Sequence, residues 1–197
     1  PNIDLSVVMK YYNIGPENVE IKIGKYIKLK NLPIEKMAKP NNNREIQIPI
    51  DENGFMDVNF IGGPGSFSYY PYLYFYDNSM EGNTSIKDKV LLIGAYSVVG
   101  IAFDEKKSPY GALFGLEHHA NALNTILNQD FLYKLSDLQN IAIMLVIALL
   151  LGLFVPRMSI GPSLVVTAGF LISYSVISYL LFDYYSIITA FATPLIQ

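Results

Sequence analysis

The sequence predicts an α/β sandwich with a mixed sheet, followed by transmembrane α-helices. Short segments of alternating polar and apolar residues near its start are typical of β-strands. A continuous apolar segment at 89–95 and an amphipathic one at 116–129 are typical of a buried strand and of a helix that covers a sheet. After residue 137 the only charged residues are Arg157 and Asp183. A water-facing domain over residues 1–137 therefore precedes a membrane anchor.

Five segments near the start of the chain are predicted to be strands. A Gly24-Lys25 turn separates the second from the third, and a turn at 51–54 separates the last two, so we expect β-hairpins. Pro49 has no backbone N–H group, which makes its segment an edge strand or the end of a strand. The five segments are rich in alternating, β-branched or aromatic residues and lie at 5–12, 19–23, 26–29, 45–50 and 55–61.

Residues 67–76 are also predicted to be strand-like, because they are dense in aromatic side chains. One face would pack in the core and the tyrosine hydroxyls of the other would reach water. A surface that stacks on a ligand, or a dimer interface, is the alternative. The preceding segment at 61–66 is glycine-rich like a phosphate loop, but Pro64 removes a donor and the residues that follow are strand-like. We therefore expect a structural turn there.

Two long apolar segments, at 138–155 and 160–182, are predicted to cross a membrane. At ~1.5 Å per residue the first reaches about 27 Å, close to the thickness of the hydrocarbon core of a bilayer. As buried helices of a soluble protein, the two would overfill any core that this chain can build. A third apolar segment, at 186–197, is interpreted as the start of a truncated third span. Because the chain begins at Pro1 and stops within this segment, we expect an interior piece of a longer protein, with the 1–137 domain truncated at its N-terminus.

The composition excludes several kinds of site and partner. The chain has no cysteine, so it has neither disulfides nor thiolate metal sites. Its net charge is -3 and its Lys/Arg residues do not form long runs, which argues against nucleic acid as a partner. The sequence assembles no Ser-His-Asp triad, paired carboxylates or nucleotide-binding motif. We therefore predict no catalytic residues, no metal site and no cofactor within this chain.

Three residues are candidates for sensing a ligand: Asp104, Ser108 and His119. The first two lie between the predicted buried strand and the helix, and open α/β sheets bind ligands in such loops; a solvated loop is the alternative. By helical phase His119 lies near the apolar stripe and His118 off it. Adjacent helix positions point about 100° apart, so the two imidazoles cannot share one metal ion. We expect a buried, hydrogen-bonded His119, with a ligand-sensing or pH-sensing role as the alternative.

Several motifs resemble, in their order, those of a known family. The pattern is similar to the type-two CHASE domain, the cyclase- and histidine-kinase-associated sensory extracellular module of bacterial receptors, over roughly the whole chain. That family has a VLIGA strand, a loop ending in Asp, a Thr-Pro turn and a helix that opens with PG-x-E-x-HA. This chain departs from it at Ser108, Phe114 and His118, where Thr, Pro and an aliphatic residue are usual. The matching segments lie at 48–54, 58–65, 90–95, 100–104, 108–109 and 115–121, and closely spaced spans follow.

The resemblance implies an extracytoplasmic α/β sensor over residues 1–137 and a multi-pass anchor in the cell inner membrane. Lys134 and Arg157 lie on opposite sides of the first span, so the positive-inside rule does not decide the orientation. The implied function is to receive an unknown extracytoplasmic ligand, in a homodimer, and to regulate a cytoplasmic class III adenylate or guanylate cyclase. The short junction at 135–138 predicts that a movement of the sensor reaches the first span directly.

Several alternatives stay open at this point. A histidine kinase or a Ser/Thr kinase could replace the cyclase as the output domain. A membrane-anchored binding or scaffold protein would have no catalytic output at all. An extracytoplasmic enzyme that uses Asp104 and His119 is a further alternative. Whether the parent protein is an enzyme therefore depends on the sequence that follows Gln197.

Overall fold

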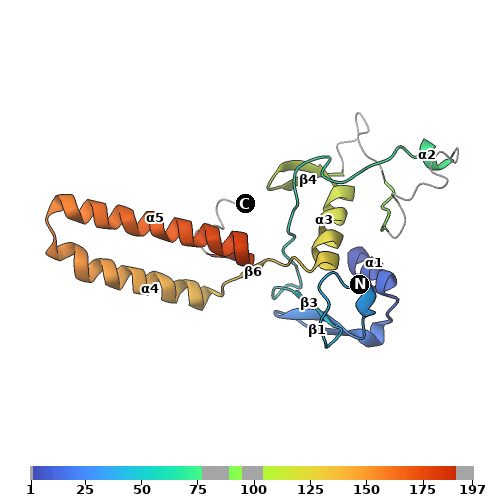
Figure 1. Cartoon of the computed structure of the whole chain (residues 1–197), viewed down its shortest axis with the longest axis horizontal. Helices are drawn as coiled ribbons and strands as arrows, with labels where there is room; N and C mark the ends of the chain where they lie inside the picture. Colours follow the sequence, from blue (N-terminus) through green and yellow to red (C-terminus); the bar gives the residue numbers. More distant parts are fainter. Residues whose placement is uncertain (1, 77–88, 95–103, 190–197) are drawn as a thin grey trace. The chain divides into compact units, whose positions relative to one another are not determined.

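The computed structural model describes residues 2–76, 89–94 and 104–189 (Figure 1). The chain divides into two compact units, Pro1–Phe131 and Leu132–Gln197. The first unit combines α-helices with small antiparallel sheets, and the second consists of two long helices with a short pair of strands. The predicted class, α/β followed by apolar helices, is confirmed.

The first unit contains the following elements, with short 3-10 turns at Pro16–Asn18 and Ile34–Lys36. They are α1 (Ile3–Tyr12), β1 (Val19–Lys22), β2 (Tyr26–Leu29), β3 (Ile46–Pro49), α2 (Leu73–Tyr76), β4 (Glu105–Ser108), β5 (Gly111–Phe114) and α3 (Gly115–Asn128).

The predicted hairpin across Gly24-Lys25 is confirmed, but the one across the turn at 51–54 is wrong, because residues 55–61 belong to no strand. Strands β1, β2 and β3 form an antiparallel sheet in that order, with Ile21 opposite Ile27 and Ile27 opposite Ile48. Gly24 makes the first turn in a left-handed conformation, at φ +73°, which glycine adopts without steric cost. Pro49 ends the edge strand β3, as its missing donor predicts.

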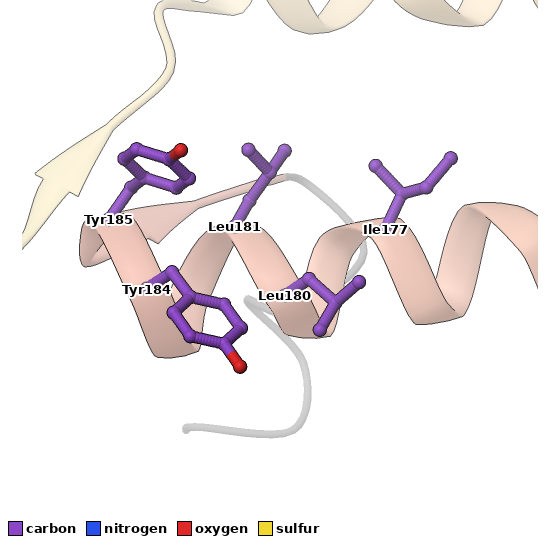
Figure 2. A pocket seen from close by; sticks show the side chains of 5 residues that line it. All are labelled: Ile177, Leu180, Leu181, Tyr184 and Tyr185. Atoms are coloured by element: carbon purple, nitrogen blue, oxygen red, sulfur yellow. The ribbon is translucent and has the colours of Figure 1, made fainter.

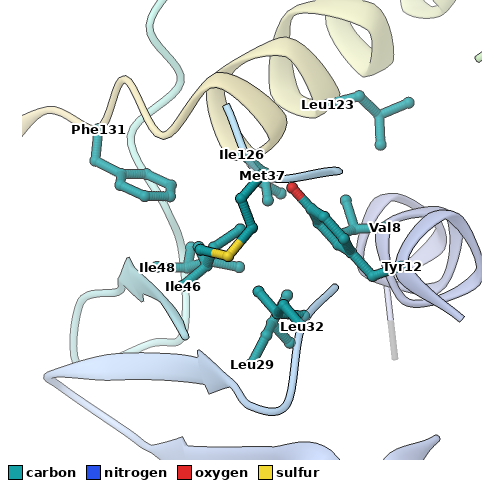
Figure 3. Close-up of a cluster of buried hydrophobic side chains, with 10 residues drawn as sticks. All are labelled: Val8, Tyr12, Leu29, Leu32, Met37, Ile46, Ile48, Leu123, Ile126 and Phe131. Carbon is teal, nitrogen blue, oxygen red and sulfur yellow. The ribbon is translucent and has the colours of Figure 1, made fainter. Parts of the chain in front are cut away.

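The predicted strand at 5–12 is wrong, because these residues form helix α1. The Asn2 side chain accepts a hydrogen bond from Asp4 N at 3.3 Å, and Asn13 ends the helix in a left-handed conformation. Val8 and Tyr12, one turn apart, point into the core (Figure 3). The β-branched and aromatic residues that suggested a strand therefore belong to a helix, because the chain supplies a cap at each end.

The predicted helix at 116–129 is confirmed as α3, which begins at Gly115 and ends at Asn128. Its apolar stripe packs on the three-stranded sheet and on α1, and this contact is the core of the unit (Figure 3). The cluster of buried apolar side chains comprises Val8, Tyr12, Leu29, Leu32, Met37, Ile46, Ile48, Leu123, Ile126 and Phe131.

The predicted buried strand at 89–95 is wrong over its described part, residues 89–94, which has no regular secondary structure. Ala95 lies outside the described residues. Val90 and Leu92 pack against the core cluster, whereas Ile93 is 84% exposed. The segment thus contacts the core on one side only, and it lacks the strand partners and second covering layer that a strand buried on both faces needs.

Two further strand predictions are wrong. Residues 55–61 belong to no strand, although the chain there follows helix α3 as described below. The aromatic segment at 67–76 forms only the short helix α2, and its Tyr72 and Tyr76 are exposed. In contrast, the glycine-rich segment at 61–66 is the predicted turn, closed by a bond from Ser66 N to Gly63 O.

The second unit contains the two helices that are long and apolar enough to cross a membrane. Helix α4 begins with a capping box, in which Gln139 N donates to Ser136 Oγ and Ser136 N donates to Gln139 Oε1. None of its side chains is buried, so an apolar surface surrounds it, as lipid requires. The elements are β6 (Tyr133–Lys134), α4 (Asp137–Phe154), a 3-10 turn (Val155–Arg157), α5 (Ile160–Tyr185) and β7 (Ile187–Ile188).

These two helices overlap the segments predicted as spans, 138–155 and 160–182. The third predicted span, at 186–197, begins with Ser186, which ends α5 in a left-handed conformation, and continues into β7. Residues 190–197 lie outside the described residues, so the third span stays a prediction.

Candidate functional site

A row of buried polar side chains on α3 holds the segment at 59–65, which leads into the turn at 61–66. Thr125 Oγ1 accepts a hydrogen bond from Asn59 N at 3.1 Å, and Asn121 Oδ1 accepts one from Ile61 N at 3.0 Å. Glu117 Oε1 accepts a third, from Gly65 N at 2.8 Å. All three acceptors are at most 5% exposed. We call this row Glu117, Asn121 and Thr125 the α3 polar row.

The α3 polar row can bond successive residues of the segment because the spacing of its side chains along the helix matches the spacing of residues along an extended chain. Residues four apart on a helix lie about 6 Å apart along its axis, and residues two apart in an extended chain lie about 6.6 Å apart. The segment runs antiparallel to α3, so that Asn59 and Ile61 meet Thr125 and Asn121 in turn. A helix face thus provides the acceptors that a neighbouring strand would otherwise provide, and this explains why 55–61 resembles a strand in sequence.

The row is also bonded along the helix itself. Asn121 Nδ2 donates to Glu117 O at 2.8 Å, and Thr125 Oγ1 donates to Asn121 O at 2.9 Å. These bonds fix the side-chain rotamers, and so they fix the positions of the acceptors. Sequence reasoning missed these residues. The only signal in the sequence was the spacing of polar residues at i, i+4 and i+8 on the helix face opposite the apolar stripe, and a solvated face shows the same pattern.

Asp104 lies beside the first turn of α3. Its carboxylate occupies the space that a Cβ atom on Gly115 would take, so the glycine allows this close approach. A negative charge at the N-terminus of a helix is favourable, since the N–H groups there have no partners within the helix. Asp104 is exposed, and the predicted loop that follows it is the β4–β5 hairpin.

Ser108 closes the turn of that hairpin. Its hydroxyl donates to Gly111 O at 2.7 Å and accepts from Tyr110 N at 3.2 Å. Gly111 has φ +103°, a conformation that side chains strain. Serine can replace the threonine that is usual in the resembled family because only the hydroxyl takes part in this turn.

His119 is hydrogen-bonded as predicted, but it is not buried. Its Nδ1 lies 2.8 Å from Asp4 Oδ1 on α1; the histidine side chain is 46% exposed and that of Asp4 is 12% exposed. His118 is the more buried of the two, with Nε2 3.3 Å from Lys106 O and its ring edge-to-face with Phe60. The predicted phase therefore holds, because His119 lies on the side of α3 that packs against α1, and His118 lies off it beside Phe60. The predicted burial of His119 is wrong, because that position lies at the margin of the contact with α1.

The three candidate sensing residues share no partner among the residues that the structure describes. Asp104 lies at the start of α3, Ser108 bonds within its own hairpin, and His119 bonds to α1. Over residues 2–76, 89–94 and 104–189, no three His, Asp or Glu side chains gather as ligands of a metal ion. This part of the chain thus gives the extracytoplasmic-enzyme alternative no shared site for Asp104 and His119.

The second unit has a hollow at the end of α5 (Figure 2). It measures about 440 Å³, and its lining comes from successive turns of this one helix. Apart from two tyrosine hydroxyls the lining is apolar, so it suits an acyl chain or a neighbouring helix better than a polar stimulus. The lining residues are Ile177, Leu180, Leu181, Tyr184 and Tyr185.

The strands β6 and β7 join the chain before α4 to the chain after α5. They pair in parallel, with Tyr133 opposite Ile187 and Lys134 opposite Ile188. Tyr133 N donates to Ser186 O at 2.9 Å, and Leu135 N donates to Ile188 O at 3.2 Å. The chain that enters the helix pair and the chain that leaves it are therefore bonded to each other.

Comparison with known proteins places this architecture in a family. No curated protein and no solved structure matches the chain significantly. A family model described as the CHASE2 domain matches residues 1–154, and this match covers the first unit, β6 and the whole of α4. The chain therefore belongs to the CHASE2 family, whose domains are the sensory extracellular parts of signalling receptors.

Proposed function

We propose that this chain is the extracytoplasmic sensor and multi-pass inner-membrane anchor of a bacterial receptor, and that the receptor regulates a cytoplasmic class III adenylate or guanylate cyclase. The observation that carries the proposal is the junction between the two units. A sensory extracellular domain is followed, after the two residues of β6, by Leu135, by the capping residue Ser136 and then by α4. No flexible linker separates the domain from the apolar helix.

The direction of β7 supports a third span. Strand β6 runs toward the start of α4, and β7 is parallel to it, so the chain at β7 runs in the direction in which α4 leaves. A chain that continued in this direction would run back into the membrane alongside the two helices. An odd number of spans then puts the output domain on the side opposite the sensor, as a receptor requires.

The same pairing provides two routes for a signal. A displacement of β6 moves α4 through the short junction and moves β7 through the bonds from Tyr133 and Leu135. A stimulus shifts the output only if it binds the two signalling states with different affinities. Asp104, Ser108 and His119 remain our candidate sensing residues, and among them His119 presents a half-exposed ring bonded to Asp4.

The topology can be tested with single cysteines, because the natural chain has none. We expect Lys107→Cys, in the sensor, and Tyr184→Cys, at the end of α5, to react in intact cells with a maleimide that cannot cross the membrane. Ser159→Cys, between the two helices, should react only after permeabilisation. Labelling of Ser159→Cys in intact cells, with Lys107→Cys protected, would show the opposite orientation and contradict the proposal.

The output can be tested by expressing the complete reading frame that contains this chain. Membranes from these cells should convert ATP to cyclic AMP or GTP to cyclic GMP above the level of the empty vector. Transfer of phosphate from ATP to protein, without cyclic nucleotide, would favour a kinase output. Membranes with neither activity, from a reading frame that ends soon after Gln197, would favour the scaffold alternative.

Coupling can be tested by an insertion at the junction. A Gly-Ser insertion after Lys134 separates β6 from α4 and from Leu135, whose N–H donates to Ile188 O, so we expect the basal output to change. The same insertion after Asn42, in an exposed turn of the sensor, is the control and should leave the output near that of the natural chain. Equal outputs from both insertions would contradict direct transmission through the junction.

A further inference from the structure

Strand β1 is an edge strand whose apolar Ile21 is left uncovered, as is Ile23 in the turn that follows it. On the core face of the sheet, Ile46 and Ile48 of β3 are 1% and 2% exposed. At the other edge, Ile21 and Ile23 are 57% and 62% exposed. An open strand edge with apolar side chains is a template for pairing with another chain.

The backbone groups of this edge point outward at alternate residues. Lys30 N donates to Asn18 O at 2.9 Å, and β1 and β2 pair in register from there. Because hydrogen-bonded and non-hydrogen-bonded pairs alternate in an antiparallel ladder, residues 18, 20 and 22 bond toward β2. The N–H and C=O groups of Val19, Ile21 and Ile23 then face away from the sheet.

The sequence of β1 is complementary to itself about Ile21. An antiparallel copy related by a two-fold axis at this residue brings Ile21 opposite Ile21 and Val19 opposite Ile23, and these are the outward-bonding residues. The same axis brings Glu20 opposite Lys22 of the second copy, twice. These are non-hydrogen-bonded positions, where Cα atoms lie about 4.5 Å apart and side chains are closest.

The charges of Glu20 and Lys22 are suited to this pairing. Glu20 accepts from Lys30 Nζ at 2.5 Å and from the Tyr26 hydroxyl at 2.9 Å, and the Lys30 ammonium lowers the pKa of its carboxyl group. Glu20 is therefore ionised at neutral pH. Among the described residues Lys22 has no ion pair. A carboxylate from a second copy would provide one.

We propose that a second copy of this chain binds along β1, antiparallel and with the two-fold axis at Ile21, and joins the two three-stranded sheets into one. The pairing covers Ile21 and Ile23 and places two Glu20–Lys22 ion pairs across the axis. It deepens the proposed receptor function, on which it rests for the presence of two copies on one face of a membrane.

Cysteine cross-linking of the full chain in membranes tests the register of this pairing. In Ile21→Cys chains the two cysteines would be directly opposite, with Cα atoms about 5.5 Å apart, within the range of a disulfide. In Ile23→Cys chains, the matched control, they would lie four residues apart, about 13 Å, which is beyond that range. We expect mild oxidation to produce the disulfide-linked dimer at least tenfold faster for Ile21→Cys. Equal rates, a faster Ile23→Cys reaction, or no cross-link in either chain would overturn the proposal.

A charge reversal in the Ile21→Cys background tests the ion pairs. Lys22→Glu places like charges opposite each other twice, so the cross-linking rate should fall about threefold to tenfold. Lys107→Glu, in the exposed strand β4, makes the same change of charge away from β1 and should leave the rate unchanged. Equal effects of the two reversals would overturn the specific pairing. Neither measurement uses an output domain, so their failure would leave the cyclase, kinase and topology tests unaffected.

Discussion

Replacing Asn121 by alanine should release the 59–65 segment from α3 while the helix itself stays folded. Asn121 is 1% exposed and accepts the hydrogen bond of Ile61 N at 3.0 Å. The variant leaves this N–H group without its acceptor and removes the bond to Glu117 O as well. The change therefore acts on the contact between the segment and the helix.

The free-energy cost of this replacement follows from the burial of the two groups in the lost hydrogen bond, Asn121 Oδ1 and Ile61 N. A buried donor left without an acceptor costs about 1–3 kcal/mol. The Ile61 residue is 51% exposed, so its amide regains some hydration and the cost should be about 1–2 kcal/mol. That corresponds to a factor of roughly 5 to 30 in the equilibrium between bound and released segment.

Hydrogen–deuterium exchange of the full chain in a membrane mimetic measures this effect. The amide of residue 61 should exchange roughly 5 to 30 times faster in Asn121→Ala, while amides in the middle of α3 keep their rates. Asn128→Ala is the control, because it is the same replacement on the same helix and removes only an exposed bond to Asn124. An unchanged rate at residue 61, or equal acceleration along the whole of α3, would refute the role given to the polar row.

Three further predictions concern other parts of the fold. Burial raises the pKa of Tyr12 to about 12, so the contribution of the protonated hydroxyl to stability is complete below pH 10 and is lost as the pH rises through 12. Tyr12→Phe should remove this loss. The measurement is the difference in thermal unfolding between the two chains at pH 8 and at pH 11. Gly111→Ala forces a side chain into φ +103° and should destabilise the β4–β5 hairpin by about 1–3 kcal/mol, seen as faster amide exchange at 105–114, whereas Gly152→Ala meets no neighbour and should not. Ser136→Ala removes the cap of α4 and should weaken its first turn by about 1 kcal/mol, measured by exchange at 137–140.

Local chemistry made the first hairpin and the long helices predictable. A glycine at the turn and alternation on both sides specify β1 and β2 without any knowledge of the rest of the fold. The apolar helices are predictable because lipid is their solvent, so no tertiary contact has to be guessed. Helix α1 was not predictable in this way, because its valines and tyrosines are typical of strands and the deciding caps, Asn2 and Asn13, lie outside the apolar segment.

The candidate site depended on contacts between distant segments, which the sequence does not display. Glu117, Asn121 and Thr125 resemble a solvated stripe until the 59–65 segment is placed against them. The burial of the two histidines was assigned to the wrong residue for the same reason. Ser108 and Asp104 were placed in a loop, but Ser108 ends strand β4, and the contacts of the two residues depend on a hairpin and on a glycine that allows close approach.

The energy of the β6–β7 pairing is of the size that a signalling element needs. The β6–β7 ladder, with the flanking backbone bonds from Tyr133 and from Leu135, holds the open end of the α4–α5 pair. Each backbone hydrogen bond contributes about 0.5–1.5 kcal/mol net, so a few of them reach the 1–3 kcal/mol that typically couples two sites in an allosteric protein. A stronger β6–β7 pairing would fix one signalling state, and a weaker pairing would let α4 move without affecting the chain after α5. A pairing of this strength can be kept in one signalling state and lost in the other.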